Sequence, residues 1–462
     1  MTRENIKKNA TYVLASISAN LHWSGMSQET INDSKLAILD AIGCGIAGSS
    51  DSAVHNLMRA LEISQETGQV PTFGNPKRFL PRAAALINGA MIHALEMDDT
   101  HSFSSVHAGG PVLASALSAS HLQAASGARF IEAVVAGYEI ACRLGMAIRG
   151  KTPYHRGFHP TGICGIFGAA TAAGKVFDLD APGFLSAWGI AGSMASGLMS
   201  YLQNGAWTKK LQPGWAAQSG FLAAVLARGG YLGPDDIFQG NYNFCSAYAD
   251  AFDPEPLTEE LGKRFEVSRM SYKRFACCRT IHAPITAALK LRELPGFHPT
   301  RIEEIHAILA DEDIPLVVEP LEKKKHPETI VDAQFSMPFG VALALIEGDA
   351  MADQYTADRL KDPHIQDLCR KFRYTLNSEY TRRRPLYFPC ELRVRTAGTW
   401  HTASVDAPLG DYTNPMSREE MLRKFRRLCC PVLGDEVTPY LERSVLSLET
   451  RLQVAHLFSL KQ

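Results

Sequence analysis

Apolar residues recur at helical spacing through most of the first half of the chain. In the segment that begins at Ser34, for example, Leu36, Leu39 and Ile46 fall on one side of a helix. Small residues, mostly Ala, Gly and Ser, fill many of the positions between the larger ones. The same spacing predicts further helices over about 81–95, 111–125, 128–148, 161–177, 182–199 and 214–228.

One of these expected helices contains three glycines, Gly162, Gly165 and Gly168. Each glycine costs up to ~1 kcal/mol relative to alanine inside a helix, so another property must compensate for it. We expect the glycines to let a second backbone approach closely, because they have no Cβ atom. Such tight packing would make a rigid support for side chains in the neighbouring loops, although packing alone is a sufficient reason for the glycines.

The pattern changes after Gly233. Residues 301–310 and 390–405 alternate between apolar and polar positions, which predicts strands, and Ala397-Gly398 is a suitable hairpin turn. Helical spacing returns at 280–293, at 333–347 and after Ser417, where Glu420 completes a capping box. We therefore predict a mainly α fold with an α+β part, in which a smaller α+β segment interrupts a large all-helical domain.

Composition narrows the classes of protein to which the chain could belong. Its 462 residues favour two domains, and 46% hydrophobic residues with a net charge of −1 argue against a nucleic-acid or membrane-surface partner. The polar first residues and the absence of a run of ~18 apolar residues predict a cytoplasmic protein. Ten cysteines without a C-x-x-C pair are typical of reduced, buried thiols.

Two histidine-bearing turns are the best candidates for chemistry. His159 precedes Pro160 and Thr161, where a helix is expected to begin, and Thr161 could cap that helix while the helix dipole favours a bound carboxylate. His107 lies in an earlier loop, where His101 competes with it for an acid–base role. A purely structural role is the alternative for each histidine.

Acidic residues precede the first of these turns. Glu96, Asp98 and Asp99 follow an expected helix, whose C-terminal end disfavours negative charge, and this mismatch favours a function such as orienting an imidazole. Asp98, Asp99, His101 and His107 could also bind a metal ion. No H-E-x-x-H pattern accompanies them, so we expect no metal.

Two basic segments could supply an anion pocket. Lys209 and Lys210 stand immediately before the helix expected at 214–228, and residues 267–292 contain no acid but several basic side chains. Next to two histidines, such segments would bind carboxylates, whereas ordinary solvent-exposed charge is the alternative. The basic side chains of residues 267–292 include Arg269, Lys273, Arg274, Arg279 and Lys290.

Seven segments, taken together, resemble the MmgE/PrpD family, which includes 2-methylcitrate dehydratases, cis-aconitate decarboxylases and iminodisuccinate epimerases. The resemblance extends over nearly the whole chain. It is carried by residues 39–49, 88–100, 157–161, 208–217, 233–234, 277–282 and 333–336.

This resemblance implies a homodimeric enzyme that uses no cofactor. It implies an all-helical domain built from residues 1–267 and 406–462, and a smaller α+β lid at 268–405. The family's active-site acid corresponds to Glu96 or Asp98, and its further site residues to Thr100, His107, His159 and Lys209. Its basic lid segment corresponds to Lys273, Arg279 and His282.

The chain departs from many relatives at three places: they have Asp where Glu96 stands, His where Gln212 stands and Tyr near Phe339. The first difference lengthens the acid by one methylene. The other two remove groups that carry protons or form hydrogen bonds.

Three functions are compatible with these residues. The first is a cofactor-independent lyase, a dehydratase or decarboxylase of a small citrate-like di- or tricarboxylate. In that hypothesis Lys209, the helix start at Thr161 and the lid cations hold the carboxylates while His107 and His159 exchange protons. The second is an epimerase or isomerase of a small dicarboxylate such as iminodisuccinate, which begins with the same proton abstraction. The third is a non-catalytic polycarboxylate-binding homologue.

Overall fold

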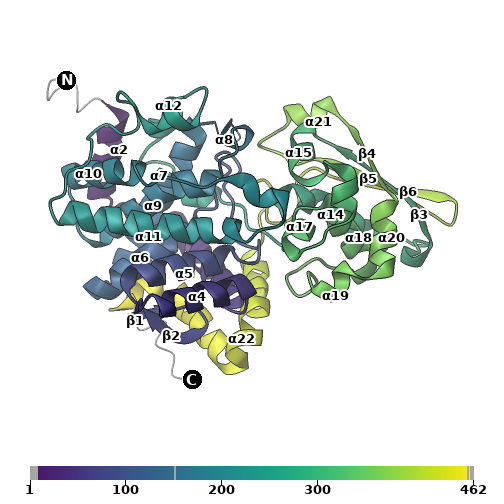
Figure 1. Ribbon diagram of the computed structural model, residues 1–462, viewed down its shortest axis with the longest axis horizontal. Coiled ribbons are helices and arrows are strands. Elements are labelled where there is room, and N and C mark those ends of the chain that lie inside the picture. The colour runs from purple at the N-terminus through teal and green to yellow at the C-terminus, as the bar shows by residue number, and fades with distance from the viewer. Residues whose placement is uncertain (1–8, 150–151, 455–456, 458–462) are drawn as a thin grey trace.

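The computed structural model describes residues 9–149, 152–454 and 457. They form two parts that lie next to each other (Figure 1). The helical part contains the elements α2 to α13 and α22, and the α+β part contains the elements α14 to β6. The mainly α fold with an α+β part is confirmed.

The helical part is built from long helices and one short hairpin. The hairpin strands are β1 (Thr67–Thr72) and β2 (Asn75–Phe79). The longer helices are α2 (Ala10–Asn20), α3 (Gln28–Gly48), α4 (Ser52–Ile63), α5 (Pro81–His93), α6 (Gly109–Gln123), α7 (Gly127–Ala147), α9 (Pro160–Val176), α10 (Ala181–Gly192), α11 (Thr208–Arg228) and α22 (Arg418–Leu446). The short helices are α8 (Thr152–His155), α12 (Phe244–Tyr248) and α13 (Glu255–Thr258).

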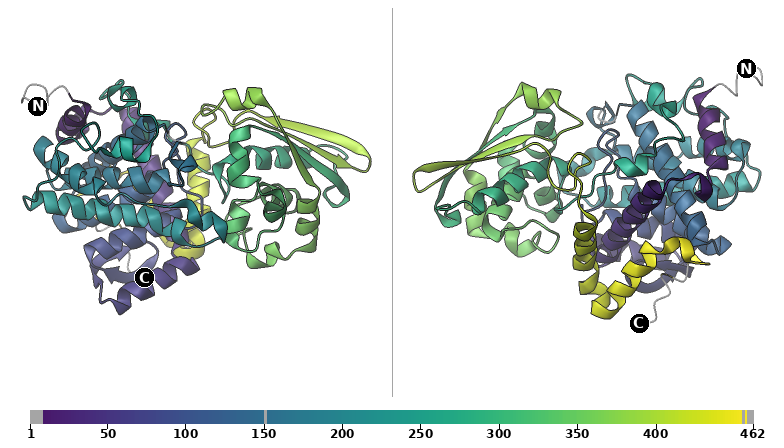
Figure 2. Two further views of the ribbon diagram at one scale, coloured as in Figure 1. Left: turned by 45° about the horizontal axis from the view of Figure 1, so that its top comes forward. Right: turned by 180° about the vertical axis from the view of Figure 1, so that it is seen from behind.

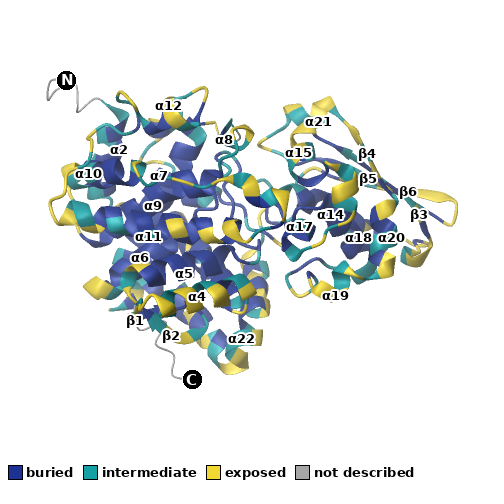
Figure 3. Ribbon diagram, viewed as in Figure 1, coloured by how far each residue is buried: buried dark blue, intermediate teal, exposed yellow. Residues whose placement is uncertain are grey.

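Helix α9 lies between α7 and α11 in a densely packed centre, which is almost entirely buried in Figure 3. A Cβ atom on Gly168 would lie 2.6 Å from the carbonyl oxygen of Gly137 in α7. One on Gly162 would lie 2.5 Å from the carbonyl oxygen of Ser196. The expected close approach of backbones is thus confirmed for these two glycines, whereas Gly165 instead makes room for a proline ring.

Both ends of the chain contribute to the helical part. Helix α22 packs against α3, so the last long helix lies beside one of the first (Figure 2). The buried ammonium of Lys424 in α22 lies 2.6 Å from the carboxylate of Asp40 in α3 and 2.6 Å from the carbonyl oxygen of Met97. Because a buried charge needs a partner, this ion pair fixes how the C-terminal segment docks.

The α+β part is a four-stranded sheet with helices. Its strand order is β4-β3-β5-β6, with β3 and β4 parallel and the other pairs antiparallel. Val394 of β5 pairs with Ile305 on one side and His401 on the other. The strands are β3 (Ile302–Leu309), β4 (Phe372–Leu376), β5 (Cys390–Thr396) and β6 (Thr399–Val405). The helices are α14 (His282–Arg292), α15 (Ile314–Val317), α16 (Leu321–Lys325), α17 (Ile330–Gln334), α18 (Met337–Glu347), α19 (Ala357–Leu360), α20 (Pro363–Arg370) and α21 (Ser378–Arg382).

Several local predictions are confirmed. The hairpin turns at Ala397 and Gly398, whose φ angles of 51° and 77° suit a tight two-residue turn. Ser417 caps α22 and forms the expected capping box with Glu420. No helix within the described residues combines the length and apolar character needed to cross a membrane.

Two helix boundaries are predicted wrongly. The helix expected over 182–199 ends at Gly192, and the helix expected from Gly214 begins at Thr208. Pro213 stands inside α11 although proline usually ends a helix. Lys209 and Lys210 therefore belong to the first turn of α11 rather than preceding it. The domain boundaries at 268 and 405 stay predictions.

Candidate active site

A cavity of about 560 Å³ is lined by residues of both parts. Thr100, His107 and Lys209 line it from the helical part, and Leu316 and Phe335 line it from the α+β part. Lys273 and Arg279, which belong to the segment leading into α14, complete its basic lining. The cavity brings together the histidine loop and both basic segments that the sequence singled out.

Glu96 is held at the cavity in an uncommon backbone conformation. It follows the end of α5 with φ at 55°, in the left-handed region that a residue with a side chain rarely adopts. Its carboxylate accepts hydrogen bonds from Lys209 and, at 3.1 Å, from Lys273. Burial alone would raise the pKa of Glu96, but the charges of Lys209 and Lys273 lower it well below its ordinary value. Glu96 is therefore an ionised partner of two lysines.

Close helix packing places Lys209 beside α5. A Cβ atom on Gly89 of α5 would lie 2.7 Å from the Cα atom of Gly214 in α11, so these two backbones nearly touch. The Nζ atom of Lys209 lies 2.7 Å from the Nε2 atom of His93. Burial lowers the pKa of Lys209, against the opposing charge of Glu96. Lys210 instead pairs with Asp51 at 2.6 Å and does not line the cavity.

His93 is a site residue that the sequence reasoning missed. It is the last residue of α5 and is fully buried, with its Nδ1 atom 2.6 Å from the carboxylate of Asp98. Since the ammonium of Lys209 only donates, Nε2 of His93 accepts and Nδ1 carries the proton donated to Asp98. A histidine at the end of an otherwise apolar helix, three residues before Glu96, was the available signal.

We call the group of His93, Glu96, Asp98, Lys209 and Lys273 the cavity cluster. Asp98 lies behind the lining, 3.6 Å from the Nζ atom of Lys273. Burial would raise the pKa of Asp98, but His93 and His107 lower it below its ordinary value. Of the two acids that the resemblance offered, Glu96 lines the cavity and Asp98 orients His93.

His107 presents a defined tautomer to the cavity. Its Nδ1 atom lies 2.7 Å from the carbonyl oxygen of Asp99 and 3.1 Å from the hydroxyl of Thr100. A carbonyl only accepts, so Nδ1 carries the proton and Nε2 has the free lone pair. Burial, reinforced by the charge of Lys273, lowers the pKa of His107 well below its ordinary value. The ring is therefore neutral at pH 7.

His159 lies behind the cavity lining, at the N-cap of α9. Its ring centroid is 6.2 Å from that of His107 and 5.8 Å from that of His93. Its Nδ1 atom donates to Gln212 at 2.8 Å, because the Gln212 amide nitrogen is already donating to Leu198. Nε2 of His159 is buried without a hydrogen-bond partner among the described residues. Burial, followed by the charge of Lys209, lowers its pKa well below the ordinary value.

Two expected substrate-binding residues do not line this cavity. Thr161 was expected to cap its own helix, and this is wrong: its buried hydroxyl accepts the backbone N–H of His107 at 3.0 Å. Its expected part in holding a substrate carboxylate stays a prediction. His282 is buried at the start of α14 with its ring 5.2 Å from that of Phe275. Thr161 thus positions the His107 loop, and His282 packs inside the α+β part.

Arg279 lines the cavity but already has partners. Its guanidinium hydrogen-bonds Asp411 and Ser102 and lies 3.9 Å from the ring centroid of Phe388. Phe339, where many relatives have a nearby tyrosine, is buried against Tyr355 and lines no part of the cavity. The departure at Phe339 therefore leaves the cavity's hydrogen-bonding groups unchanged.

Asp99 is a buried carboxyl group next to the His107 loop. It accepts hydrogen bonds from the Tyr138 hydroxyl at 2.7 Å and from the backbone of Gly109 at 3.1 Å. Burial, together with the charge of Asp98, raises the pKa of Asp99 to about 7.

A metal centre would have to compete with the lysines. Among the described residues, ligand atoms of His93, Asp98 and His107 lie within 4.8 Å of one another. However, His93 and Asp98 already hydrogen-bond each other, and the ammonium groups of Lys209 and Lys273 lie against them. The metal-binding set considered from the sequence, Asp98, Asp99, His101 and His107, does not act as one site, because Asp99 hydrogen-bonds Tyr138 and His101 hydrogen-bonds Glu266. The arrangement favours a hydrogen-bonded cluster over a divalent cation.

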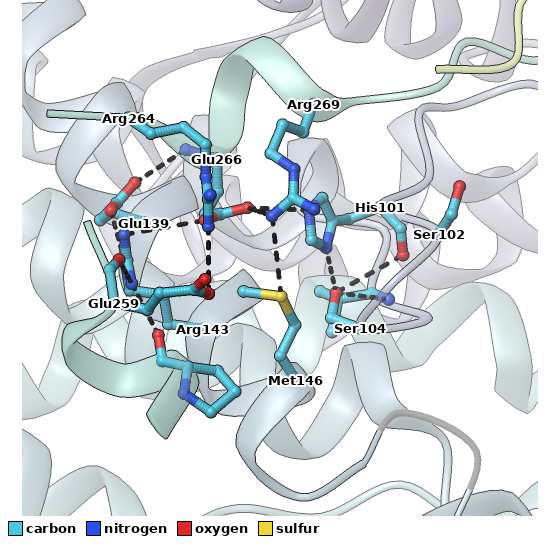
Figure 4. A network of polar contacts seen from close by, with 12 residues as sticks. His101, Ser102, Ser104, Glu139, Arg143, Met146, Glu259, Arg264, Glu266 and Arg269 are labelled. Carbon is cyan, nitrogen blue, oxygen red and sulfur yellow. Dashed lines mark hydrogen bonds and ion pairs between the residues drawn. The ribbon is translucent and has the colours of Figure 1, made fainter. Parts of the chain in front are cut away.

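His101 belongs to a second buried ionic group, shown in Figure 4, which we call the closed cluster. Its ring binds Ser104 at 2.8 Å through Nδ1 and Glu266 at 3.1 Å through Nε2. Glu266 is fully buried and also accepts from Arg269 at 2.9 Å. The remaining members of the closed cluster are Glu139 and Arg143. With both nitrogens bound, His101 is not the proton carrier of the cavity.

Comparison with known proteins identifies the family. Residues 13–257 match the MmgE/PrpD N-terminal domain, and residues 275–448 match the MmgE/PrpD C-terminal domain. The chain belongs to the MmgE/PrpD family.

Relatives span nearly the whole chain. It is 29% identical to the cis-aconitate decarboxylase-like protein oryM of Aspergillus oryzae, over 98% of this chain and 97% of that protein. It is 28% identical to a cis-aconitate decarboxylase of Aspergillus terreus, over 99% and 96%. With the cis-aconitate decarboxylase of Mus musculus it shares 26% identity, over 96% and 91%.

Proposed function

We propose that the protein is a lyase that decarboxylates a citrate-type unsaturated polycarboxylate such as cis-aconitate. One observation carries the proposal: a neutral histidine with a fixed tautomer, His107, lines the same cavity as Lys209, Lys273 and Arg279. End-to-end similarity to cis-aconitate decarboxylases supports decarboxylation over dehydration.

Fixed positive charge would bind the substrate. The ammonium groups of Lys209 and Lys273 both hydrogen-bond the carboxylate of Glu96, and Lys273 also lies 3.6 Å from Asp98, so each ammonium has a counter-charge but keeps a hydrogen-bond donor for a ligand. A substrate carboxylate would take up their remaining donors, and a second carboxylate would face Arg279. Low exposure of these groups strengthens the attraction, because water screens it little.

His107 would deliver the proton. Burial and the charge of Lys273 depress the pKa of His107, but carboxylates bound beside it would raise that pKa and favour the imidazolium. When the bond from carbon to the departing carboxylate breaks, its electron pair stays on the substrate carbon and carbon dioxide leaves. The proton on Nε2 of His107 then passes to that carbon, so that one proton is consumed for each carbon dioxide released.

The neighbouring histidines would support this step. His93 relays the charge of Asp98 to Lys209 through its two nitrogens, and this holds the ammonium in place. His159 would be the second proton carrier, because its Nε2 lone pair has no partner in the described protein and its ring lies 6.2 Å from that of His107. Closure of the α+β part as a lid, and a homodimeric assembly, stay predictions.

Proton NMR in deuterated water tests the reaction directly. The purified protein would be incubated separately with cis-aconitate, citrate, 2-methylcitrate and iminodisuccinate. Carbon dioxide release with one deuterium incorporated at the decarboxylated carbon supports the proposal. Water loss identifies a dehydratase, and deuterium exchange with inversion identifies an epimerase. Binding that leaves every acid unchanged identifies a non-catalytic polycarboxylate-binding protein and overturns the enzymatic proposal.

A further inference from the structure

The cavity has a polar and an apolar section. None of Thr100, His107, Lys209 and Lys273 lines the neighbouring second cavity, which has a volume of about 540 Å³. The residues that the two cavities share are apolar or aromatic, so this section connects the polar section to the second cavity. They are Tyr201, Leu202, Pro315, Leu316 and Phe335.

The apolar section begins directly beside the proposed carboxylate-binding groups. The Nζ atom of Lys209 lies 5.2 Å from the ring centroid of Phe335, and that ring lies 6.3 Å from the ring of Tyr201. Tyr201 and Phe335 are both buried, whereas Leu202 and Leu316 are only partly covered. A ligand at Lys209 would thus have an apolar wall next to it, and two leucines from opposite parts of the molecule further along.

Hydrogen bonds hold both sides of this section in place. Lys324 donates to the carbonyl oxygens of Leu316 and Phe335, each at 2.8 Å. Lys323 donates across to the helical part, to the carbonyl oxygen of Gln203 at 2.6 Å. The apolar section is therefore a built passage between the two parts rather than a loose gap.

A molecule made only of carboxylates and a short carbon skeleton has nothing to place against such a wall. The volume of about 560 Å³ also falls within the ~300–1,000 Å³ of pockets that enclose ligands with a substantial carbon skeleton. Because apolar surface gains free energy when it leaves water, the wall favours a ligand that carries an aliphatic chain beside its carboxylates.

We propose that the substrate is a citrate-type polycarboxylate that bears an aliphatic chain. Its carboxylates bind at Lys209, Lys273 and Arg279, and its chain extends between Leu202 and Leu316 towards the second cavity. The inference rests on the proposed function for the placement of the carboxylates. The chain has a limited useful length, because the second cavity is lined by charged residues, among them Glu319, Lys323 and Asp332.

Binding of unreactive analogues tests the inference without requiring turnover. Tricarballylate, which has neither a double bond nor a hydroxyl group to lose, would be compared by calorimetry with tricarballylates carrying alkyl chains of increasing length. Each methylene that becomes buried raises affinity by about fourfold. The gain should stop once the chain reaches the charged second cavity. Affinity that stays constant or falls with chain length overturns the inference.

Turnover separates this inference from the proposed function. Conversion of cis-aconitate with no advantage for its alkyl-substituted form overturns the inference alone. Stronger binding of alkylated tricarballylates with no conversion of any acid overturns the proposed function and supports the ligand class. A protein that binds none of these acids overturns both.

Matched variants locate the chain. Leu316→Asn and, from the other side, Leu202→Asn should each reduce the affinity ratio of alkylated to plain tricarballylate by about tenfold, because an amide replaces apolar wall. Leu294→Asn is the control, since Leu294 is exposed in the same α+β part and lines neither cavity. Thermal unfolding verifies that each variant is folded. An affinity ratio that both wall variants leave unchanged overturns the inference.

Discussion

The cavity cluster and the closed cluster are built from the same kinds of residues but have different surroundings. Each contains a buried histidine, two buried carboxylates and two basic side chains. In the closed cluster, Glu266 is surrounded by protein: it contacts His101, Arg143, Arg264 and Arg269. In the cavity cluster, Glu96, Lys209 and Lys273 border a space large enough for a ligand.

This difference teaches that burial and charge do not by themselves identify a site. The closed cluster joins α7 to the segment that leads to Lys273, through the contacts of Glu266 with Glu139 and Arg143. Its charges are therefore paired with one another inside the protein, which favours a role in stability. In the cavity cluster, the charged groups of Glu96, Lys209 and Lys273 border the cavity, where we propose that they bind a substrate.

The largest effect is expected when His107 is replaced by glutamine. The amide can still donate to the carbonyl of Asp99, but it cannot carry a proton to the substrate. We expect kcat to fall by ~10²–10⁴-fold. The free energy of unfolding should change by less than ~1 kcal/mol, because no buried group loses its partner. Steady-state kinetics and urea unfolding measure the two quantities.

His101→Gln is the matched control, in the same loop and with the same change. The His101 ring binds Ser104 and Glu266 at the same time through its two nitrogens, and one flexible amide cannot reproduce that bridge, so we expect the free energy of unfolding to fall by ~1–3 kcal/mol. The folded fraction should retain a kcat close to that of the unchanged protein. A His101→Gln protein that is stable but inactive would contradict the contrast between the clusters.

Glu266→Gln should cause the largest loss of stability, about 3 kcal/mol, because it removes a buried negative charge that Arg269 hydrogen-bonds at 2.9 Å and that lies 3.7 Å from the buried guanidinium of Arg143. Burial would raise the pKa of Glu266, but the hydrogen bond from His101 and nearby cations lower it to about 2. A lowered pKa stabilises the fold above the unfolded value of about 4.3, and this contribution is lost as the pH falls towards 2. Urea unfolding should therefore show the gap between the two proteins narrowing below about pH 4.

A smaller effect is expected at Gln212, which fixes the tautomer of His159. Gln212→Leu removes the acceptor of Nδ1, and we expect kcat to fall by about one order of magnitude. Gln212→Glu keeps the acceptor and adds a negative charge, which raises the pKa of His159. It should restore most of kcat while shifting the acid limb of the pH–rate profile to higher pH. If the limb does not move, His159 does not take part in proton transfer.

The smallest effect is a change in how stability depends on pH. The pKa of Asp99 is raised to about 7, against about 3.9 when unfolded, so the native state holds a proton that the unfolded chain has lost. Between these values the folded protein loses stability as the pH rises. Asp99→Asn should remove this contribution, so its advantage over the unchanged protein should grow from pH 5 to 7 and then level off. Urea unfolding at four pH values measures it, and parallel profiles would refute it.

Much of the fold could be predicted because its determinants are local. Helical spacing located α5, α6, α7 and α9 to within about two residues at most ends, and alternation located β3, β5 and β6. The start of α11 was predicted wrongly, because packing against α5 and α9 keeps the helix continuous through Pro213, a residue that disfavours a helix interior.

The sequence by itself determined which residues are chemically suited to the site. His107, Glu96 and Lys209 are titratable residues that stand in loops or at the ends of expected helices. Only the tertiary structure decided which of them share a space. In the structure His107 borders the cavity, whereas His101 binds Glu266 in the closed cluster. His93 contacts Lys209, and Thr161 hydrogen-bonds the backbone of His107 instead of lining the cavity. The physical reason is that the spacing of residues in the sequence predicts only which side chains are neighbours within one helix or strand. The contacts among α5, α11 and the segment around Lys273 depend on how backbones that are distant in the sequence pack together.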